Sequence, residues 1–205
     1  MSNLPSMGSI SDEDLIVIYD GGVMVENETI IGVGKFHEIK KHCNNIHEID
    51  FPCVLLPGFI DCHTHICYAG SRSIEYSKKN AGISYQKILS EGGGIYDTME
   101  KTRLASDEEL IKNTISRLER HFFEGVLTCE VKSGYGINFD QEIRLLKIIN
   151  EINLSHPSDV ISTCLAAHVP PNDSQTSTGE YLKLIVKELF PILRKENLTN
   201  RIDVF

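Results

Sequence analysis

One apolar segment that ends in two histidines decides the fold: Val54-Leu55-Leu56-Pro57-Gly58-Phe59-Ile60-Asp61-Cys62-His63-Thr64-His65. Its apolar part is continuous, as expected of a β-strand that is buried on both faces. Side chains alternate between the faces of a strand, so His63 and His65, together with Asp61, are predicted to point to the same side of the sheet. Two imidazoles placed in this way can share one metal ion, and Asp61 could orient them.

Downstream of this segment, helix signals alternate with strand signals. Ser106-Asp107-Glu108-Glu109 is a capping box, which predicts a helix that Gly125 ends. The spacing of apolar side chains predicts further elements: a strand over 126–131, a helix from about 139, a strand over 160–166, a helix over 178–195 and the start of a strand at 201–205. This alternation predicts a parallel sheet with right-handed crossovers.

Polar residues gather where the predicted strands end. That placement is typical of a β/α barrel, whose chemistry lies at the C-terminal strand ends, but an open doubly wound sheet binds ligands there too. A closed barrel needs eight strands and about 250 residues. The roughly 150 residues after Cys53 supply about four strands, which is too few for a complete barrel.

The N-terminal part has a different pattern. Short β-branched runs at 15–19, 23–25 and 29–34 are separated by Gly and Asn turns, which predicts a small β unit. Residues 1–11 are small and polar and are expected to form a disordered lead-in.

Composition and charge exclude several classes of protein. The 205 residues carry 20 Lys and Arg against 29 Asp and Glu, a formal charge of −9 without a basic stretch, so nucleic acid is not an expected partner. No apolar run approaches the roughly 20 residues that span a bilayer, and the first residues lack a signal sequence, so a cytoplasmic protein without membrane contact is expected. Cys62, Cys129 and Cys164 lie in strand-like runs and are expected to pack as small apolar side chains.

Several motifs carry a family resemblance. Residues 57–65, PGFIDCHTH, resemble the first-strand signature of the metal-dependent amidohydrolase superfamily. Further segments in the same order resemble imidazolonepropionases, namely Gly70-Ser71-Arg72, Gly92-Gly93-Gly94-Ile95, Glu130-Val131-Lys132-Ser133-Gly134-Tyr135-Gly136, and Ala166-Ala167-His168 before Pro170-Pro171. The resemblance runs from about Gly21 to Phe205.

The resemblance implies a fold and an activity. Members of this family fold as a (β/α)8 barrel with a small β-sandwich beside it. The chain is therefore expected to be α/β, with part of the sandwich over 12–55 and about the first four β/α units of the barrel over 56–205. The family hydrolyses the cyclic amide of 4-imidazolone-5-propanoate, a small anion, to N-formimino-L-glutamate in histidine degradation. A homodimer of the full-length form is compatible with the resemblance.

The resemblance also assigns residues. His63 and His65 would be ligands of one divalent or trivalent metal ion, zinc or iron. Arg72 would bind the propanoate carboxylate, which the two-pronged donor geometry of a guanidinium group suits. Tyr135, between two glycines, and His168, directly after a strand, would form hydrogen bonds to the substrate.

Other residues are assigned less firmly by the same resemblance. Tyr85 aligns with a residue near the substrate, although packing at the start of a helix explains it equally well. The glycines at 92–94 are expected to form a loop near the pocket and not a phosphate cradle, because no Gly-Lys-Ser/Thr follows them. His37, His42 and His47 are expected to be solvent-exposed, since their spacing fits no standard zinc pattern.

The expected site is incomplete within this sequence. In the family, the third histidine ligand, the acid–base Glu and His, and a metal-binding Asp lie on later strands, beyond Phe205. The chain is therefore expected to be a fragment that is inactive alone and binds metal weakly, and its catalytic acid and base stay unassigned. Two alternatives remain. Another amidohydrolase, such as a nucleobase deaminase, would keep the two histidines without needing Arg72, and a truncated non-catalytic relative would bind a partner.

Overall fold

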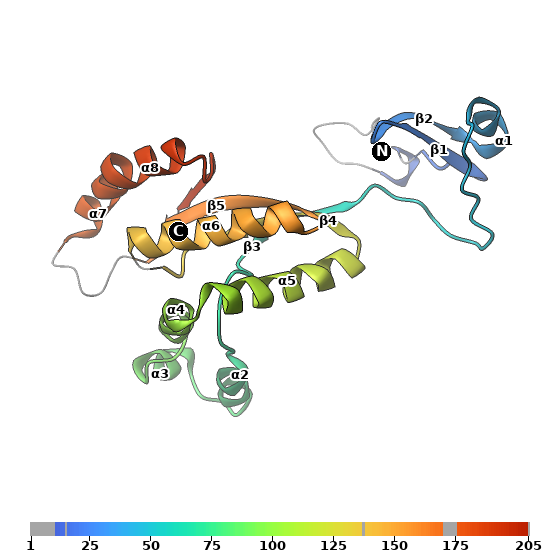
Figure 1. Ribbon diagram of the computed structural model, residues 1–205. Coiled ribbons are helices and arrows are strands. Elements are labelled where there is room, and N and C mark those ends of the chain that lie inside the picture. Colours follow the sequence, from blue (N-terminus) through green and yellow to red (C-terminus); the bar gives the residue numbers. More distant parts are fainter. Residues whose placement is uncertain (1–10, 15, 137, 170–175, 205) are drawn as a thin grey trace. The chain divides into compact units, whose positions relative to one another are not determined.

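The computed structural model describes residues 11–14, 16–136, 138–169 and 176–204 (Figure 1). They group into two compact units that divide between Pro57 and Gly58. Of the predicted lead-in over residues 1–11, only Ser11 lies inside the described residues. Within the described stretches, no helix is both long and apolar enough to cross a bilayer.

The first unit is built on an antiparallel strand pair, β1 (Gly21–Glu26) and β2 (Thr29–Lys35). Asn27 and Glu28 join the strands with φ angles of 47° and 63°, the left-handed conformation of a tight hairpin turn. Short helical segments complete the unit, namely η1 (Asp12–Asp14), α1 (Phe36–Ile39) and η2 (Lys40–His42). The strands predicted over 23–25 and 29–34 are confirmed.

The strand predicted over 15–19 is wrong for the residues that are described. Residues 16–18 have no regular structure, and Tyr19 and Asp20 form a turn into β1. The side chains of Ile16, Val17 and Tyr19 are 63%, 66% and 80% exposed. A β-branched run forms a strand where a neighbouring strand supplies hydrogen bonds and a packing surface, and the described residues of this unit supply neither.

The second unit is α/β and contains a parallel sheet with strands in sequence order: β3 (Phe59–Thr64), β4 (Val126–Lys132), β5 (Asp159–Ala167) and β6 (Ile202–Val204). Strands that lie side by side in sequence order are typical of a β/α barrel, whereas a doubly wound sheet reverses its order at a switch point. The fold is thus consistent with part of an amidohydrolase barrel, as predicted.

Helices fill the connections between the strands (Figure 1). They are α2 (Ser73–Asn80), α3 (Tyr85–Ser90), α4 (Ile95–Leu104) and α5 (Asp107–Phe123) before β4, α6 (Phe139–Ser155) before β5, and α7 (Thr178–Leu184), the π-helical η3 (Ile185–Leu189) and α8 (Phe190–Lys195) before β6. The side chains of Ser106 and Asn138 cap α5 and α6 by accepting hydrogen bonds from backbone N–H groups. The helices predicted from Ser106, from about 139 and over 178–195 are confirmed.

Two apolar clusters hold these helices against the sheet. One includes Leu110 and Leu118 of α5, Val131 of β4 and Ile149 of α6, all fully buried. The other joins α6 and β5 to the α7–α8 segment and includes Leu146, Cys164, Leu189 and Leu193. Each large apolar side chain buried in this way contributes about 1.5–3 kcal/mol. The clusters fix β4 and β5, whose C-terminal ends carry the loops of the predicted site.

β3 is less buried than its sequence predicts. The strand begins only at residue 59, and Val54, Leu55 and Ile60 are 82%, 69% and 69% exposed. β3 is the edge strand of the described sheet and pairs there with β4 alone. The expectation of burial on both faces is therefore wrong.

The three strand cysteines differ for the same reason. Cys62 is exposed, against expectation, because it lies on β3, the edge strand of the described sheet. Cys129 and Cys164 on the inner strands are buried, as predicted. Burial raises the pKa of the Cys164 thiol to about 11, which keeps it protonated and unreactive.

Candidate functional site

His63 and His65 bring their imidazoles together at the end of β3. Their Nε2 atoms lie 3.3 Å apart, and their ring centroids are 5.2 Å apart. Two nitrogens that bind one zinc ion at about 2.05 Å with tetrahedral angles lie about 3.3 Å from each other. The pair therefore fits the donor positions of a single ion. Within the described residues, however, no group of three or more His, Cys, Asp and Glu side chains could hold a metal.

A β-bulge sets the direction of these histidines. Asp61 pairs with Cys129 and Thr64 with Val131, so β3 uses one residue more than β4 between the two pairs. Asp61 thereby lies on the helix side, where its carboxylate is 3.8 Å from His121 Nδ1 on α5 and accepts the backbone N–H of His63. The prediction that Asp61 points with the two imidazoles is wrong, because a bulge breaks the period-two alternation.

The surroundings of His65 favour its neutral form. Burial lowers its pKa, and the nearby His168, His63 and Lys132 lower it further. A neutral imidazole is the form that ligates a metal ion. Its buried Nδ1 has no hydrogen-bond partner among the described residues, whereas metal-bound histidines usually donate this hydrogen to a carboxylate or carbonyl.

Tyr135 and His168 complete a cluster of rings around His65. Tyr135 follows β4 and His168 follows β5, and their ring centroids lie 6.2 and 5.5 Å from that of His65. The two rings are 6.2 Å from each other. Burial raises the pKa of Tyr135, so its phenol stays protonated and can donate a hydrogen bond.

Arg72 lies at the start of α2, close enough to Tyr135 that its charge partly opposes the burial that raises the pKa of that phenol. Its Nε donates a hydrogen bond to Glu75 Oε2 at 2.8 Å. Burial lowers the pKa of Arg72, but the neighbouring Glu75 and Tyr85 raise it above the ordinary value. The other oxygen of Glu75 accepts the backbone N–H of Gly94 at 2.7 Å. Glu75 thus links the arginine to the triple-glycine loop.

Sequence comparison identifies relatives of this chain. No family model matches the chain. The chain is 40% identical over 192 residues to the imidazolonepropionase of Aliivibrio fischeri, covering 90% of this chain and 47% of that protein. It is 37% identical over 197 residues to the imidazolonepropionase of Geobacillus kaustophilus, covering 94% and 46%.

The chain belongs to the imidazolonepropionase family. It spans about half the length of the curated relatives that it matches. A third relative, the imidazolonepropionase of Streptococcus gordonii, is 43% identical over 152 residues, which are 74% of this chain and 36% of that protein.

Three residues of this imidazolonepropionase-family chain support the site and were missed in the sequence. Glu75 holds Arg72, Arg117 donates from α5 to the carbonyl oxygens of Ile66 and Tyr68 after the histidines, and Glu142 binds the Tyr135 loop. The signal for Glu142 was an acidic residue on the apolar face of a helix. Glu75 and Arg117 gave no such signal, because charged residues at exposed-looking helix positions are common.

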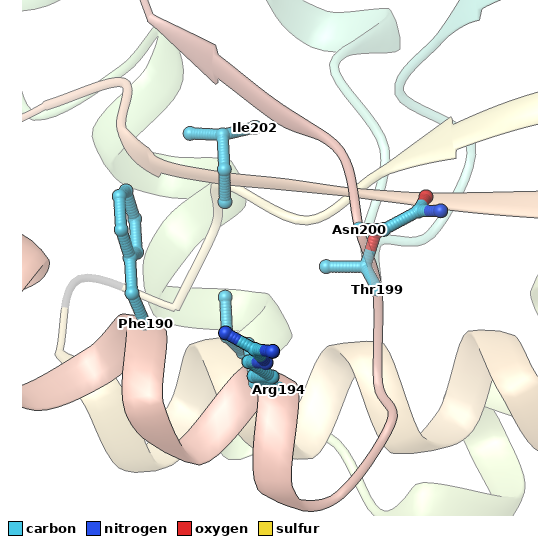
Figure 2. Close-up of a pocket in the computed structure, with 6 residues that line it drawn as sticks. Phe190, Arg194, Thr199, Asn200 and Ile202 are labelled. Carbon is cyan, nitrogen blue, oxygen red and sulfur yellow. The ribbon is translucent and has the colours of Figure 1, made fainter.

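A separate cavity of about 150 Å³ lies between α8 and the start of β6 (Figure 2). It is lined by Phe190, Leu193, Arg194, Thr199, Asn200 and Ile202. None of the residues predicted to bind metal or substrate in this imidazolonepropionase-family chain lines it.

Proposed function

We propose that the chain is part of an enzyme that hydrolyses 4-imidazolone-5-propanoate to N-formimino-L-glutamate and is inactive alone, with a zinc or iron ion held in part by His63 and His65. The observation that carries the proposal is the pair of Nε2 atoms 3.3 Å apart, with the rings of Tyr135 and His168 beside it, in a chain 40% identical to an imidazolonepropionase. A bound metal ion can activate water for the hydrolysis of a cyclic amide, and these imidazoles supply donors for one.

In this proposal Arg72 binds the carboxylate of the substrate. Glu75 accepts only the Nε–H of the five guanidinium N–H donors, so Arg72 is held in place while terminal N–H groups remain for a carboxylate. The chain carries a formal charge of −9, so a local arginine is needed to attract an anionic substrate.

Tyr135 and His168 contact the ring of the substrate in this proposal. The protonated phenol donates a hydrogen bond to a ring oxygen or nitrogen. His168 Nδ1 lies 3.3 Å from the carbonyl oxygen of Gly134. When Nδ1 of the neutral ring donates its hydrogen to that oxygen, Nε2 is left as a hydrogen-bond acceptor. A bound metal ion would lower the pKa of water and polarise the carbonyl that is attacked.

We also propose which part of the family fold each of the two units forms. The first unit, with β1 and β2, is proposed to be part of the small β-sandwich, with 12–55 as its extent. The second, over 56–205, is proposed to be half of the barrel, since its four strands run parallel in sequence order.

The experiment is a binding titration with imidazole-4-propanoate, a stable analogue, followed by NMR of the labelled chain. Arg72→Met should weaken binding at least about tenfold, the cost of one charge-assisted hydrogen bond. Arg103→Met, which changes an exposed arginine on α4, is the matched control and should leave binding unchanged. The neutral imidazole-4-propanamide should bind the unaltered chain as weakly as the acid binds Arg72→Met.

Equal binding of the acid and the amide would contradict the proposed substrate. A panel of nucleobases in the same titration tests the deaminase-like alternative. Tighter binding of a nucleobase than of the propanoate would favour that reading.

A further inference from the structure

Glu142 is an ionisable residue in an apolar place. It lies in the first turn of α6 and is 1% exposed, on the same helix face as the fully buried Leu146 and Ile149. A buried carboxylate loses its hydration and needs hydrogen bonds in return. The hydrogen-bond partners of Glu142 therefore show which part of the chain it holds in place.

Among the described residues, its hydrogen-bond partners come from one loop, Ser133-Gly134-Tyr135-Gly136. The N–H of Gly134 lies 2.9 Å from Oε2 and 3.1 Å from Oε1, and the N–H of Gly136 lies 2.7 Å from Oε1. The Ser133 hydroxyl lies close enough to lower the pKa of the carboxylate, and its oxygen accepts the N–H of Leu165 on β5 at 3.0 Å. Burial raises the pKa of Glu142, while these donors oppose the rise.

The loop fits the carboxylate closely. Gly134 has a φ of +103°, which side chains other than glycine rarely adopt. A Cβ added at Gly136 would lie 2.7 Å from Glu142 Oε1 and 2.6 Å from its backbone nitrogen. Gly136 thus leaves room for Glu142, and Gly134 supplies the positive φ of the loop.

This contact fixes two of the proposed substrate residues together. The N–H groups that bind Glu142 belong to the residues on either side of Tyr135. The carbonyl oxygen of Gly134 lies 3.3 Å from His168 Nδ1. One carboxylate therefore holds the backbone of Tyr135 and the carbonyl that contacts His168.

We propose that Glu142 is a positioning residue of the substrate site, which holds the Tyr135 loop so that the phenol and the His168 ring face the ligand together. The inference rests on the proposed function, which makes Tyr135 and His168 substrate contacts. Glu142 itself does not touch the substrate.

The test is Glu142→Gln, which keeps the shape and replaces one acceptor oxygen with an NH2 group facing N–H donors. Amide hydrogen exchange, measured by NMR, should accelerate at least about tenfold at Gly134 and Gly136 and stay unchanged at Ile149. The NOE between the Tyr135 and His168 rings should weaken, and imidazole-4-propanoate should bind about tenfold more weakly.

Two further variants keep the test decisive. Glu151→Gln, on the exposed side of the same helix, is the matched control and should change none of these readings. Ser133→Ala removes the nearby hydroxyl that helps to lower the pKa of Glu142 and leaves the carboxylate in place, so it should produce the same changes at smaller size even where Glu142→Gln fails to fold.

Unchanged exchange at Gly134 and Gly136 in folded Glu142→Gln, or in Ser133→Ala where that variant alone folds, would overturn the inference. So would faster exchange with undiminished analogue binding. If the unaltered chain does not bind the analogue at all, the proposed function fails and the substrate role of Glu142 fails with it, whatever the exchange rates show.

Discussion

The end of one strand, β3, is enough to place the side chains of His63 and His65 near the donor positions of a metal ion. Their Nε2 atoms are already 3.3 Å apart, so a metal ion would need little rearrangement of these two side chains. The half-buried His65 lies beside a second imidazole, and its pKa is lowered by burial and by the neighbouring His168 and His63.

We expect the chain to bind one zinc ion weakly through this pair. His63→Ala should reduce the affinity at least about tenfold, because each removed ligand costs well over one hydrogen bond. Competition with a chromophoric zinc chelator measures the effect. His47→Ala, at an exposed histidine of the first unit, is the matched control. Unaltered affinity in the double variant of His63 and His65 would place the metal elsewhere.

At the scale of elements, a buried ion network joins β4 to β6. Lys132 is 4% exposed, and its Nζ lies 2.7 Å from Glu130 Oε1 and 2.9 Å from Asp203 Oδ2. Burial alone lowers the pKa of Lys132, but the bonds to Glu130 and Asp203 raise it above the ordinary value. The network therefore carries a charged lysine and ties a short strand to the sheet.

Lys132→Met should lower the free energy of unfolding by about 3 kcal/mol, because Glu130 is left without its buried counter-ion. Its Oε2 already has no hydrogen-bond partner among the described residues. Urea denaturation followed by circular dichroism measures the change, with Lys112→Met on the exposed side of α5 as control. Adding Glu130→Gln to Lys132→Met should restore part of the loss, and a further loss would argue against this account.

At the scale of the whole molecule, the chain presents only two metal-ligating histidines at the proposed site within its described residues. Catalytic zinc sites have three protein ligands and an open position. With zinc or iron added, we therefore expect no sustained turnover of 4-imidazolone-5-propanoate by the chain alone. Chromatographic assay of N-formimino-L-glutamate checks this, and a sustained enzyme-like rate would contradict it.

Acid should destabilise the whole molecule. Hydrogen bonds from Lys78 lower the pKa of Glu91, capping bonds lower that of Glu180, and the bond from Lys132 lowers that of Asp203. A lowered pKa means that the unfolded chain binds protons more readily, so stability is present above the ordinary carboxyl range and is lost as the pH falls through the lowered values.

Urea midpoints measured between pH 7 and pH 3 should therefore decrease toward acid. Asp203→Asn should flatten part of this decrease and lower stability at pH 7 by up to about 1 kcal/mol, since the carboxylate is partly exposed. An unchanged slope in Asp203→Asn would show that its pair with Lys132 is not linked to folding. Glu151→Gln, at an exposed position of α6, is the control.

The candidate site was largely predictable as a set of residues but not as a geometry. His63, His65, Tyr135 and His168 follow strands, and parallel strands bring their ends to one edge, so their meeting follows from local patterns. The assignment of Arg72 to the substrate carboxylate rested on the family resemblance. The prediction for the side of the strand on which Asp61 lies was wrong. One inserted residue reverses the alternation of side chains along a strand, and it leaves no mark in the sequence.

The sequence by itself determined the order of the strands in the parallel sheet, the helix starts at Ser106 and near Phe139, and the polar residues at the strand ends. Those features depend on side-chain periodicity and on capping, which act within a few residues. Only the tertiary structure decided the bulge in β3, the exposure of Cys62 and the hydrogen bonds from the Tyr135 loop to Glu142. Each of these depends on which distant segments pack together, and that packing decides whether a polar or apolar side chain loses its water.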